Sequence, residues 1–193
     1  MGGTMADQPS AADILLNHYE RVTGSHAQFT EVSPRGSKPG VFAAIHRGFP
    51  RPNAITGFTA GLSHVHSPAN EGHTHRELVI AMADDDPAWA LAAAFVAYQL
   101  RGRCGFDHGD AINFREQIAS KSRMAAFLVV RPILISPADA EIDLDVRTVA
   151  LRQLIPLYES ERTWLMSGGN DSIFLQRFSP DELMDARRLE FQA

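Results

Sequence analysis

The segment Pro87–Leu100, PAWALAAAFVAYQL, constrains the fold most, because as a helix it is apolar on nearly every side. It is shorter than the ~20 residues that span a bilayer. Asp86 is a suitable N-cap before a proline at the first helical position, and Arg101 and Arg103 follow where the helix dipole favours positive charge. A helix that is apolar all round has to be buried on most faces. We therefore expect it to be the central helix, packed against a sheet.

A second informative stretch runs from Val149 to Gly169, VALRQLIPLYESERTWLMSGG. Its apolar part, up to Leu157, predicts a buried strand. Glu159 and Glu161 follow at a helix start, where acidic side chains are favoured on electrostatic grounds alone. Gly168 and Gly169 predict the end of that short helix, because glycine most easily takes the left-handed conformation beyond a helix.

Two further helices are indicated by capping residues at the ends of the chain. Ser10 and Asp13 cap a first helix that ends at Gly24, and residues 179–182, Ser-Pro-Asp-Glu, begin a last helix that continues through Arg187. The expected strands are Val41–His46, Ile55–Leu62, Leu78–Met82, Met124–Val130 and Val149–Leu157.

The order of these elements predicts the fold class. Residues 33–40 form a turn-rich loop, Ile142–Leu144 is ambiguous, and the stretch before Ser122 is poorly periodic. The hairpin-like spacing of residues 41–82 favours antiparallel pairing, and strands and helices do not alternate strictly. We predict an α+β fold, a mixed, largely antiparallel sheet flanked by helices, in a single domain over residues 10–193 after a disordered N-terminus, residues 1–9.

Composition and charge narrow the class of protein. Of the 193 residues, 45% are hydrophobic and 21% are charged, as in ordinary globular proteins. The net charge of -5 does not favour a surface for nucleic acid or for an anionic membrane. The one cysteine, Cys104, excludes an internal disulfide framework and fits a reducing compartment. The N-terminus lacks the basic and apolar regions of a signal peptide, so we expect a soluble cytoplasmic protein.

The sharpest enzymatic candidate is a histidine-rich loop, in which His64 and His66 are followed by His73 and His75. Imidazoles are suitable zinc or iron ligands, and carboxylates are present close by. The ligand candidates of this loop are His64, His66, Glu71, His73, His75 and Glu77. The spacing is similar to the first cupin motif but lacks its downstream glycine. A solvated loop that is rich in histidine is the alternative interpretation.

Two candidate catalytic nucleophiles have weaker sequence support than the histidine-rich loop. Residues 61–65, Gly-Leu-Ser-His-Val, begin like a nucleophile elbow, but the final glycine is a valine and no helix follows the serine. Cys104 and His108 could form a thiol–imidazole pair, although a lone cysteine after a buried helix is more often structural. Trp89 and Trp164 are interpreted as core or interface residues. The sequence contains no phosphate-binding loop, dinucleotide fingerprint or HExxH motif.

Several segments in order resemble the Suppressor of fused domain family. They are ITGFTAGLSH at 55–64, the strand that begins Arg76-Glu77-Leu78, the alanine-rich helix, MAAFLVVRPI at 124–133 and LIPLYESERTWLMSGG at 154–169. The resemblance covers residues 50–190. It implies an α+β domain that corresponds to the N-terminal lobe of the two-lobed animal members, which hold a peptide as an added strand.

The resemblance also implies a function. Stand-alone bacterial members are thought to neutralise toxins, so we expect a non-enzymatic protein-binding module whose partner is another protein, such as a cognate toxin. The alternative is a metal-dependent enzyme that uses His64, His66, His73 and His75. A third hypothesis is a homodimer that associates through exposed Trp or Phe patches. We expect no cofactor, no nucleic acid and no membrane contact, and the sequence assigns no residue to a contact surface.

Overall fold

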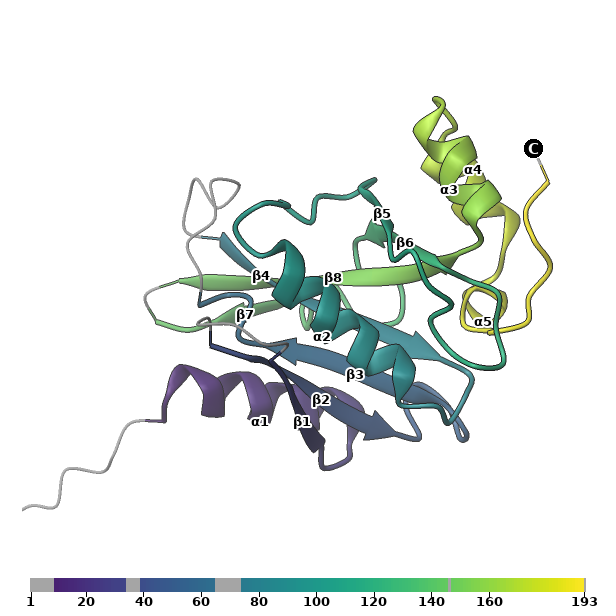
Figure 1. The fold of residues 1–193 in the computed structure, drawn as a ribbon. Coiled ribbons are helices and arrows are strands. Elements are labelled where there is room, and N and C mark those ends of the chain that lie inside the picture. The colour runs from purple at the N-terminus through teal and green to yellow at the C-terminus, as the bar shows by residue number, and fades with distance from the viewer. Residues whose placement is uncertain (1–8, 34–38, 65–73, 146, 193) are drawn as a thin grey trace, which may run out of the picture.

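The computed structural model describes residues 9–33, 39–64, 74–145 and 147–192, and Figure 1 shows their arrangement. The strands are β1 (Gln28–Val32), β2 (Val41–Arg47), β3 (Ile55–Ala60), β4 (Thr74–Met82), β5 (Ala111–Asn113), β6 (Ala126–Val130), β7 (Glu141–Asp143) and β8 (Thr148–Leu157). The helices are α1 (Ala11–Thr23), α2 (Ala88–Leu100), α3 (Glu159–Met166), α4 (Asp171–Arg177) and α5 (Pro180–Leu183).

The strands form one mixed sheet in the order β1-β2-β3-β4-β8-β6-β5, and β7 pairs with β8 beside this path. Neighbouring strands are antiparallel except β4 and β8, which run parallel from Thr74 opposite Thr148 to Val79 opposite Gln153. Parallel neighbours need a long crossover rather than a hairpin, so the chain between β4 and β8 leaves the sheet and returns to it. The predicted mixed, largely antiparallel sheet flanked by helices is confirmed.

Helices cover both faces of the sheet (Figure 1). On one face α2 packs over β2, β3 and β4, where Trp89 is fully buried with Ile80 and Met82. On the other face Tyr19 of α1 stacks on Phe58 of β3, with ring centroids 4.3 Å apart. At the far end of β6 and β8, the short helices α3, α4 and α5 enclose a third apolar cluster around Phe174.

The central helix is buried as its composition predicts, but it begins one residue late. Pro87 is the N-cap residue rather than the first helical residue, and a carboxylate oxygen of Asp86 accepts a hydrogen bond from the amide of Ala88 at 2.9 Å. Asp86 therefore still satisfies one of the free amides at the helix start. None of the described helices is long and apolar enough to cross a membrane.

The capping predictions are also confirmed. Ser10 and Asp13 form the capping box of α1, and Gly24 follows in the left-handed conformation at φ 67°. Ser179 and Glu182 form the capping box of α5, with Pro180 at its start.

Several element boundaries differ from the sequence expectation. The last helix was expected to reach Arg187, but α5 ends at Leu183. The chain then turns so that Arg188 reaches a buried carboxylate, a tertiary contact that overrides helix propensity. β4 begins at Thr74, within the expected loop, and β3 ends at Ala60 rather than at Leu62. The expected strands and helices did not include β1, β5, which is three residues long, or α4, and the ambiguous segment forms β7. Of the N-terminus expected to be disordered, residues 1–8 lie outside the described residues.

The contact between α2 and β3 requires a residue without a side chain at position 57. A Cβ atom on Gly57 would overlap the Cβ of Ala90 and lie 2.7 Å from its Cα, so helix and strand meet at their backbones. We expect Gly57→Ala to lower the free energy of unfolding by about 1–3 kcal/mol through overpacking, measured by urea denaturation.

The control is the double variant Gly57→Ala with Ala90→Gly. It removes the overlapping methyl group, so its loss of stability should be smaller than the sum of the two single losses. Strictly additive losses would show that the close approach at Gly57 does not limit the packing of α2.

Candidate functional site

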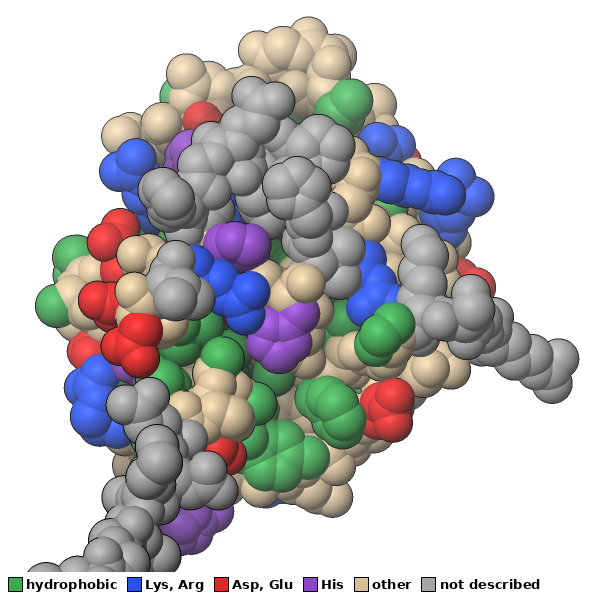
Figure 2. Space-filling view, turned by 90° about the vertical axis from the view of Figure 1, so that its left-hand side faces the viewer, with side chains coloured by type: hydrophobic (Ala, Val, Ile, Leu, Met, Phe, Trp, Pro, Cys, Tyr) green, Lys and Arg blue, Asp and Glu red, His purple; other side chains and the backbone are tan. Residues whose placement is uncertain are grey.

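The predicted histidine site is described only in part. His66, Glu71 and His73 lie outside the described residues, and His64 and His75 flank that gap. Figure 2 looks onto the end of the sheet where β4 and β8 begin, and histidine and Lys or Arg side chains lie beside one another there. Burial, and then the charges of Arg147 and His75, lower the pKa of His64. Among the described residues, no three His, Cys, Asp or Glu side chains are grouped to hold a metal ion.

Glu77, the last of the candidate metal ligands, is fully buried and is occupied by the protein itself. Its carboxylate accepts hydrogen bonds from the Thr59 hydroxyl at 2.6 Å and from the amides of Gly61 and Ser63 at 3.0 and 2.9 Å. Thr59 in turn accepts one from the amide of Leu78 at 2.8 Å. This glutamate joins the Gly-Leu-Ser turn after β3 to the Arg-Glu-Leu segment within β4, so its role is structural.

The two nucleophile candidates are not assembled either. Ser63 is buried in the turn after β3, and its amide is held by Glu77. The Cys104 thiol lies 3.5 Å from a carboxylate oxygen of Asp110, and burial raises its pKa to about 11, opposite to the shift that activates a nucleophile. His108 pairs instead with Asp171 at 3.0 Å. The structure therefore does not bring Cys104 and His108 together as a pair.

A buried ion pair was missed by the sequence analysis, which assigned Glu161 only to the start of a helix. Glu161 is fully buried and forms a double hydrogen bond with Arg188, at 2.5 and 2.6 Å. The amides of Tyr158 and Phe191 donate to the same carboxylate at 2.9 and 2.8 Å. The guanidinium also lies over the ring of Phe178 at 4.6 Å. The pair thus fixes the C-terminal segment against α3.

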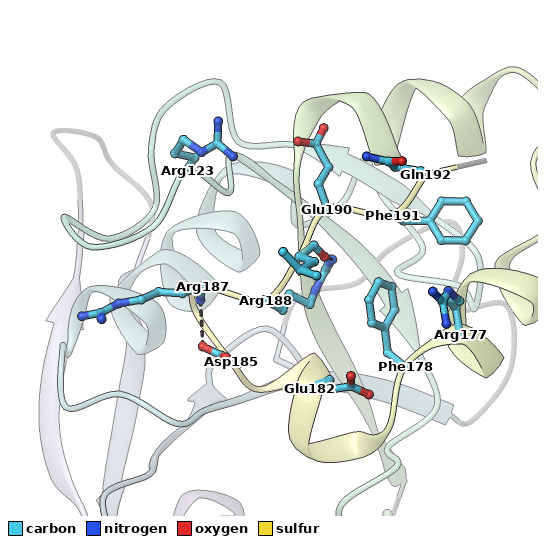
Figure 3. A pocket seen from close by; sticks show the side chains of 11 residues that line it. Arg123, Arg177, Phe178, Glu182, Asp185, Arg187, Arg188, Glu190, Phe191 and Gln192 are labelled. Atoms are coloured by element: carbon cyan, nitrogen blue, oxygen red, sulfur yellow. Dashed lines mark hydrogen bonds between the residues drawn. The ribbon is translucent and has the colours of Figure 1, made fainter.

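A groove of about 710 Å³ lies beside this pair and is drawn in Figure 3. Its carboxylates are engaged within the protein: Glu182 by Ser179, Asp185 by the amide of Arg187, and Glu190 by Ser160. The groove is lined by Arg123, Arg177, Phe178, Glu182, Asp185, Arg187, Arg188, Leu189, Glu190, Phe191 and Gln192. Positive and negative side chains are interleaved along it, so it lacks the apolar character of a protein-binding centre.

A second groove, of about 500 Å³, is more apolar and runs along a sheet edge. β1 pairs with β2 on one side, and among the described residues no strand pairs with its other side. The groove lies between this edge and α2. It is lined by Thr30, Glu31, Val32, Ser33, Ala88, Leu91, Ala92, Phe95, Phe114 and Ile118. We call this surface the β1 groove.

Aromatic side chains mark both faces of the same edge. Phe95 of α2 is 37% exposed at the β1 groove, and its ring meets that of Phe114 edge-on at 6.0 Å. On the opposite face Phe29 and Phe42 are 45% and 44% exposed. By contrast, Trp89, considered above for a self-association patch, is fully buried.

The sequence held one signal for this surface that its analysis did not use. Phe95 is the one phenylalanine in an alanine-rich helix otherwise suited to complete burial, and a large ring is harder to cover there than a methyl group. Which edge of the sheet stays open depends on strand order, which a single sequence does not show.

The sequence of this chain matches one known protein family. The family model for the Suppressor of fused protein (SUFU) matches residues 41–189. The chain belongs to the Suppressor of fused family. The match includes both strands joined by Glu77 and both partners of the Glu161–Arg188 pair, so the residues that carry the sequence resemblance include those that fix the fold. No curated protein sequence is significantly similar to this chain.

Solved structures of the Suppressor of fused family share the fold. A SUFU homologue from Neisseria gonorrhoeae FA 1090 is 15% identical, with a TM-score of 0.70 over 94% of this chain and 98% of that one. A chain in the Sufu–Fu complex is 14% identical, with a TM-score of 0.68 over 94% and 91%. Drosophila Suppressor of Fused is 13% identical, with a TM-score of 0.63 over 95% and 52%. This chain thus spans about half of the Drosophila protein.

Because Glu161 is in a buried ion pair and Glu159 is not, we expect the two glutamates of α3 to contribute very differently to the free energy of unfolding. Glu161→Gln leaves the Arg188 charge buried without a counter-charge, so we expect a loss of roughly 3–5 kcal/mol in the free energy of unfolding. Glu159→Gln is the matched control, because its ion pair with Arg162 is exposed and should contribute less than about 1 kcal/mol. Equal losses in urea denaturation would contradict the structural role of Glu161.

Glu77 predicts a pH dependence of stability. Burial raises its pKa above the ordinary value of 4.5, although its hydrogen bonds act in the opposite direction. The folded chain therefore binds this proton more tightly than the unfolded chain does. The stability of the wild type relative to Glu77→Gln should fall as pH rises from about 4.5 through the folded-state pKa.

The measurement is the free energy of unfolding of both proteins between pH 4 and 8. Glu116→Gln serves as the control, because Glu116 is exposed. A difference between wild type and Glu77→Gln that does not change with pH would show that Glu77 has no raised pKa.

Proposed function

We propose that this protein is a non-enzymatic, intracellular protein-binding module that captures its partner at the β1 groove. A partner segment adds a strand to the open side of β1, and every second side chain of that segment enters the groove. The observation that carries this proposal is the coincidence of an open strand edge with an apolar groove on its flank.

The two features work together because of the geometry of strand addition. The backbone of the added strand bonds to the edge and provides affinity, and pockets for alternate side chains provide specificity. Leu91 and Phe95 of α2 form one wall of the groove, and Val32 of β1 forms the other. Glu31 is the one charged residue of the lining, so the groove suits apolar side chains.

The family and the described chemistry support a binding role. A chain of the same fold is solved in the Sufu–Fu complex, in which it is bound to another protein. The candidate nucleophiles are occupied or deactivated: burial raises the pKa of Cys104, and the buried turn of Ser63 is held by Glu77. The metal-dependent alternative gains no support from His64 and His75, the two described ligands of its loop.

For the partner, we propose a toxin produced in the same cytoplasm, which the protein neutralises by covering it. The net charge of -5 suits a basic partner such as a nuclease, because complementary charge speeds association.

The test compares two positions on α2. Phe95→Asp places a charge in the β1 groove, whereas Gln99→Asp places the same charge one helical turn further along α2, at an exposed residue outside the groove lining. Each protein is captured from its own cells and examined by native mass spectrometry. We expect a second polypeptide at fixed stoichiometry with wild type and Gln99→Asp, and at least about tenfold less of it with Phe95→Asp.

Other outcomes have definite meanings. Equal capture by Phe95→Asp would place the partner on another surface, and a second copy of this chain as the only bound polypeptide would make the protein a homodimer. Toxin neutralisation requires that the partner, expressed alone, stops growth and that co-expression of this chain restores it. A partner harmless to cells would leave a binding module without an immunity role.

A further inference from the structure

A cluster of arginines lies on the α2 face of the sheet, beyond the end of that helix. Arg76 of β4 is opposite Ala150 of β8, and Arg152 of β8 is opposite Leu78 of β4. Leu78 and Leu154 belong to the apolar cluster beneath α2. Because side chains of a strand alternate between faces, Arg76 and Arg152 share the face of these leucines. The two side chains therefore project from neighbouring strands on one side of the sheet, offset by two residues along the strands.

A third arginine comes from the next strand of the sheet. Val130, at the end of β6, is opposite Gln153 of β8, and Arg131 follows it directly. Val129 belongs to the same cluster beneath α2, so the alternation of side chains places Arg131 on that face as well. Arg76, Arg152 and Arg131 thus come from three consecutive strands, β4, β8 and β6.

The loop after α2 ties the outer two arginines together. Asp107 of this loop binds the Arg76 guanidinium at 2.7 Å, and the ring of His108 accepts a hydrogen bond from the amide of Arg131 at 3.3 Å. Because this loop reaches β4 at one residue and the end of β6 at the next, it crosses over β8, the strand that bears Arg152.

Several donors of this cluster have no partner. Nε and Nη1 of Arg76 and Nε of Arg152 are buried without a hydrogen bond among the described residues. Nη1 of Arg152 donates a hydrogen bond to the carbonyl oxygen of Leu151, at 3.0 Å, and to no other described residue. Buried donors without a hydrogen-bond acceptor are rare in folded proteins, because each one lowers the stability of the fold. Because a guanidinium is positively charged, the acceptor that best satisfies these donors is a negatively charged group.

The charges of the cluster are not balanced either. Among the residues that the structure describes, Asp107 is the one carboxylate in direct contact with the three arginines, and Glu141, opposite Ala150 on β7, is exposed. Burial, and then the positive charges of Arg76 and Arg131, lower the pKa of Arg152. Within the described part of the chain, two of the three guanidinium charges therefore have no carboxylate in contact, which matches the double negative charge of a phosphate group.

We propose that Arg76, Arg131 and Arg152 form a binding site for a phosphate-class oxyanion, either the free ion or a small phosphate ester. Arginine suits this ligand because its planar fork presents paired donors to two oxygens. Arg131 is exposed and Arg152 is half-buried, so the cluster opens to solvent on the Arg131 side. The site is separate from the β1 groove and does not depend on the proposed partner.

The experiment is calorimetric titration of the whole protein with inorganic phosphate, at constant ionic strength maintained with chloride. Arg152→Gln and Arg131→Gln each remove one charge and its donors, and Arg51→Gln is the control, because Arg51 pairs with the exposed Asp181. We expect wild type and Arg51→Gln to bind phosphate with equal affinity. Each of the two cluster variants should bind it at least about tenfold more weakly. The exposed Arg131 keeps the test valid even if Arg152→Gln does not fold.

A second readout needs no ligand. Arg152→Gln removes an uncompensated charge, so at low salt and without phosphate its Tm should be higher than that of wild type. With phosphate present, wild type should gain more in Tm than this variant does.

The proposal is overturned if wild type shows no heat of phosphate binding beyond that of chloride, or if all four proteins bind phosphate alike. A parallel titration with glycerol 3-phosphate separates the two ligand sources. Tighter binding of the ester would identify a phosphorylated small molecule as the ligand, and binding of inorganic phosphate alone would identify the free ion.

Discussion

The parallel pairing of β4 with β8 is the constraint on which the rest of the structure depends. These strands lie side by side at the centre of the sheet, from Thr74 opposite Thr148 onward, yet the chain between them includes α2, β5, β6 and β7. A parallel pair forces this segment to cross a face of the sheet, and its most apolar part, α2, is the part that can be buried there. The contact of Gly57 with Ala90 sets how closely the helix approaches.

Both proposed sites result from this crossover. α2 lies over β2, β3 and β4 and has fewer contacts with the edge strand β1, so the wall that includes Phe95 and the edge strand together form the β1 groove. At its other end the chain turns back across β8, where Asp107 meets Arg76. One helix thus contributes a wall to the proposed protein-binding groove and leads into the loop beside a cluster of guanidiniums.

Two buried glutamates hold the ends of this arrangement. Glu77 binds the amides of Gly61 and Ser63, which fixes the turn after β3 to β4. Glu161 binds Arg188, which fixes the C-terminal segment to α3. Each carboxylate accepts several hydrogen bonds, because a buried charge is tolerated only when its acceptors are satisfied. These contacts give a physical meaning to the Gly-Leu-Ser, Arg-Glu-Leu and Glu-Ser-Glu segments that the Suppressor of fused family resemblance rests on.

The sequence by itself determined the local elements and the family. The apolar helix that ends at Leu100, the capping boxes of Ser10 and Ser179, and the longer buried strands follow from residue order, because hydrophobic period and cap chemistry act over a few positions. Tertiary structure decided what those elements meet. Sequence spacing grouped Glu77 with a metal loop and Glu161 with a helix dipole, whereas the fold buries both against distant partners. The open edge of β1 and the meeting of three arginines from separate strands depend on strand order, which no local pattern in the chain encodes.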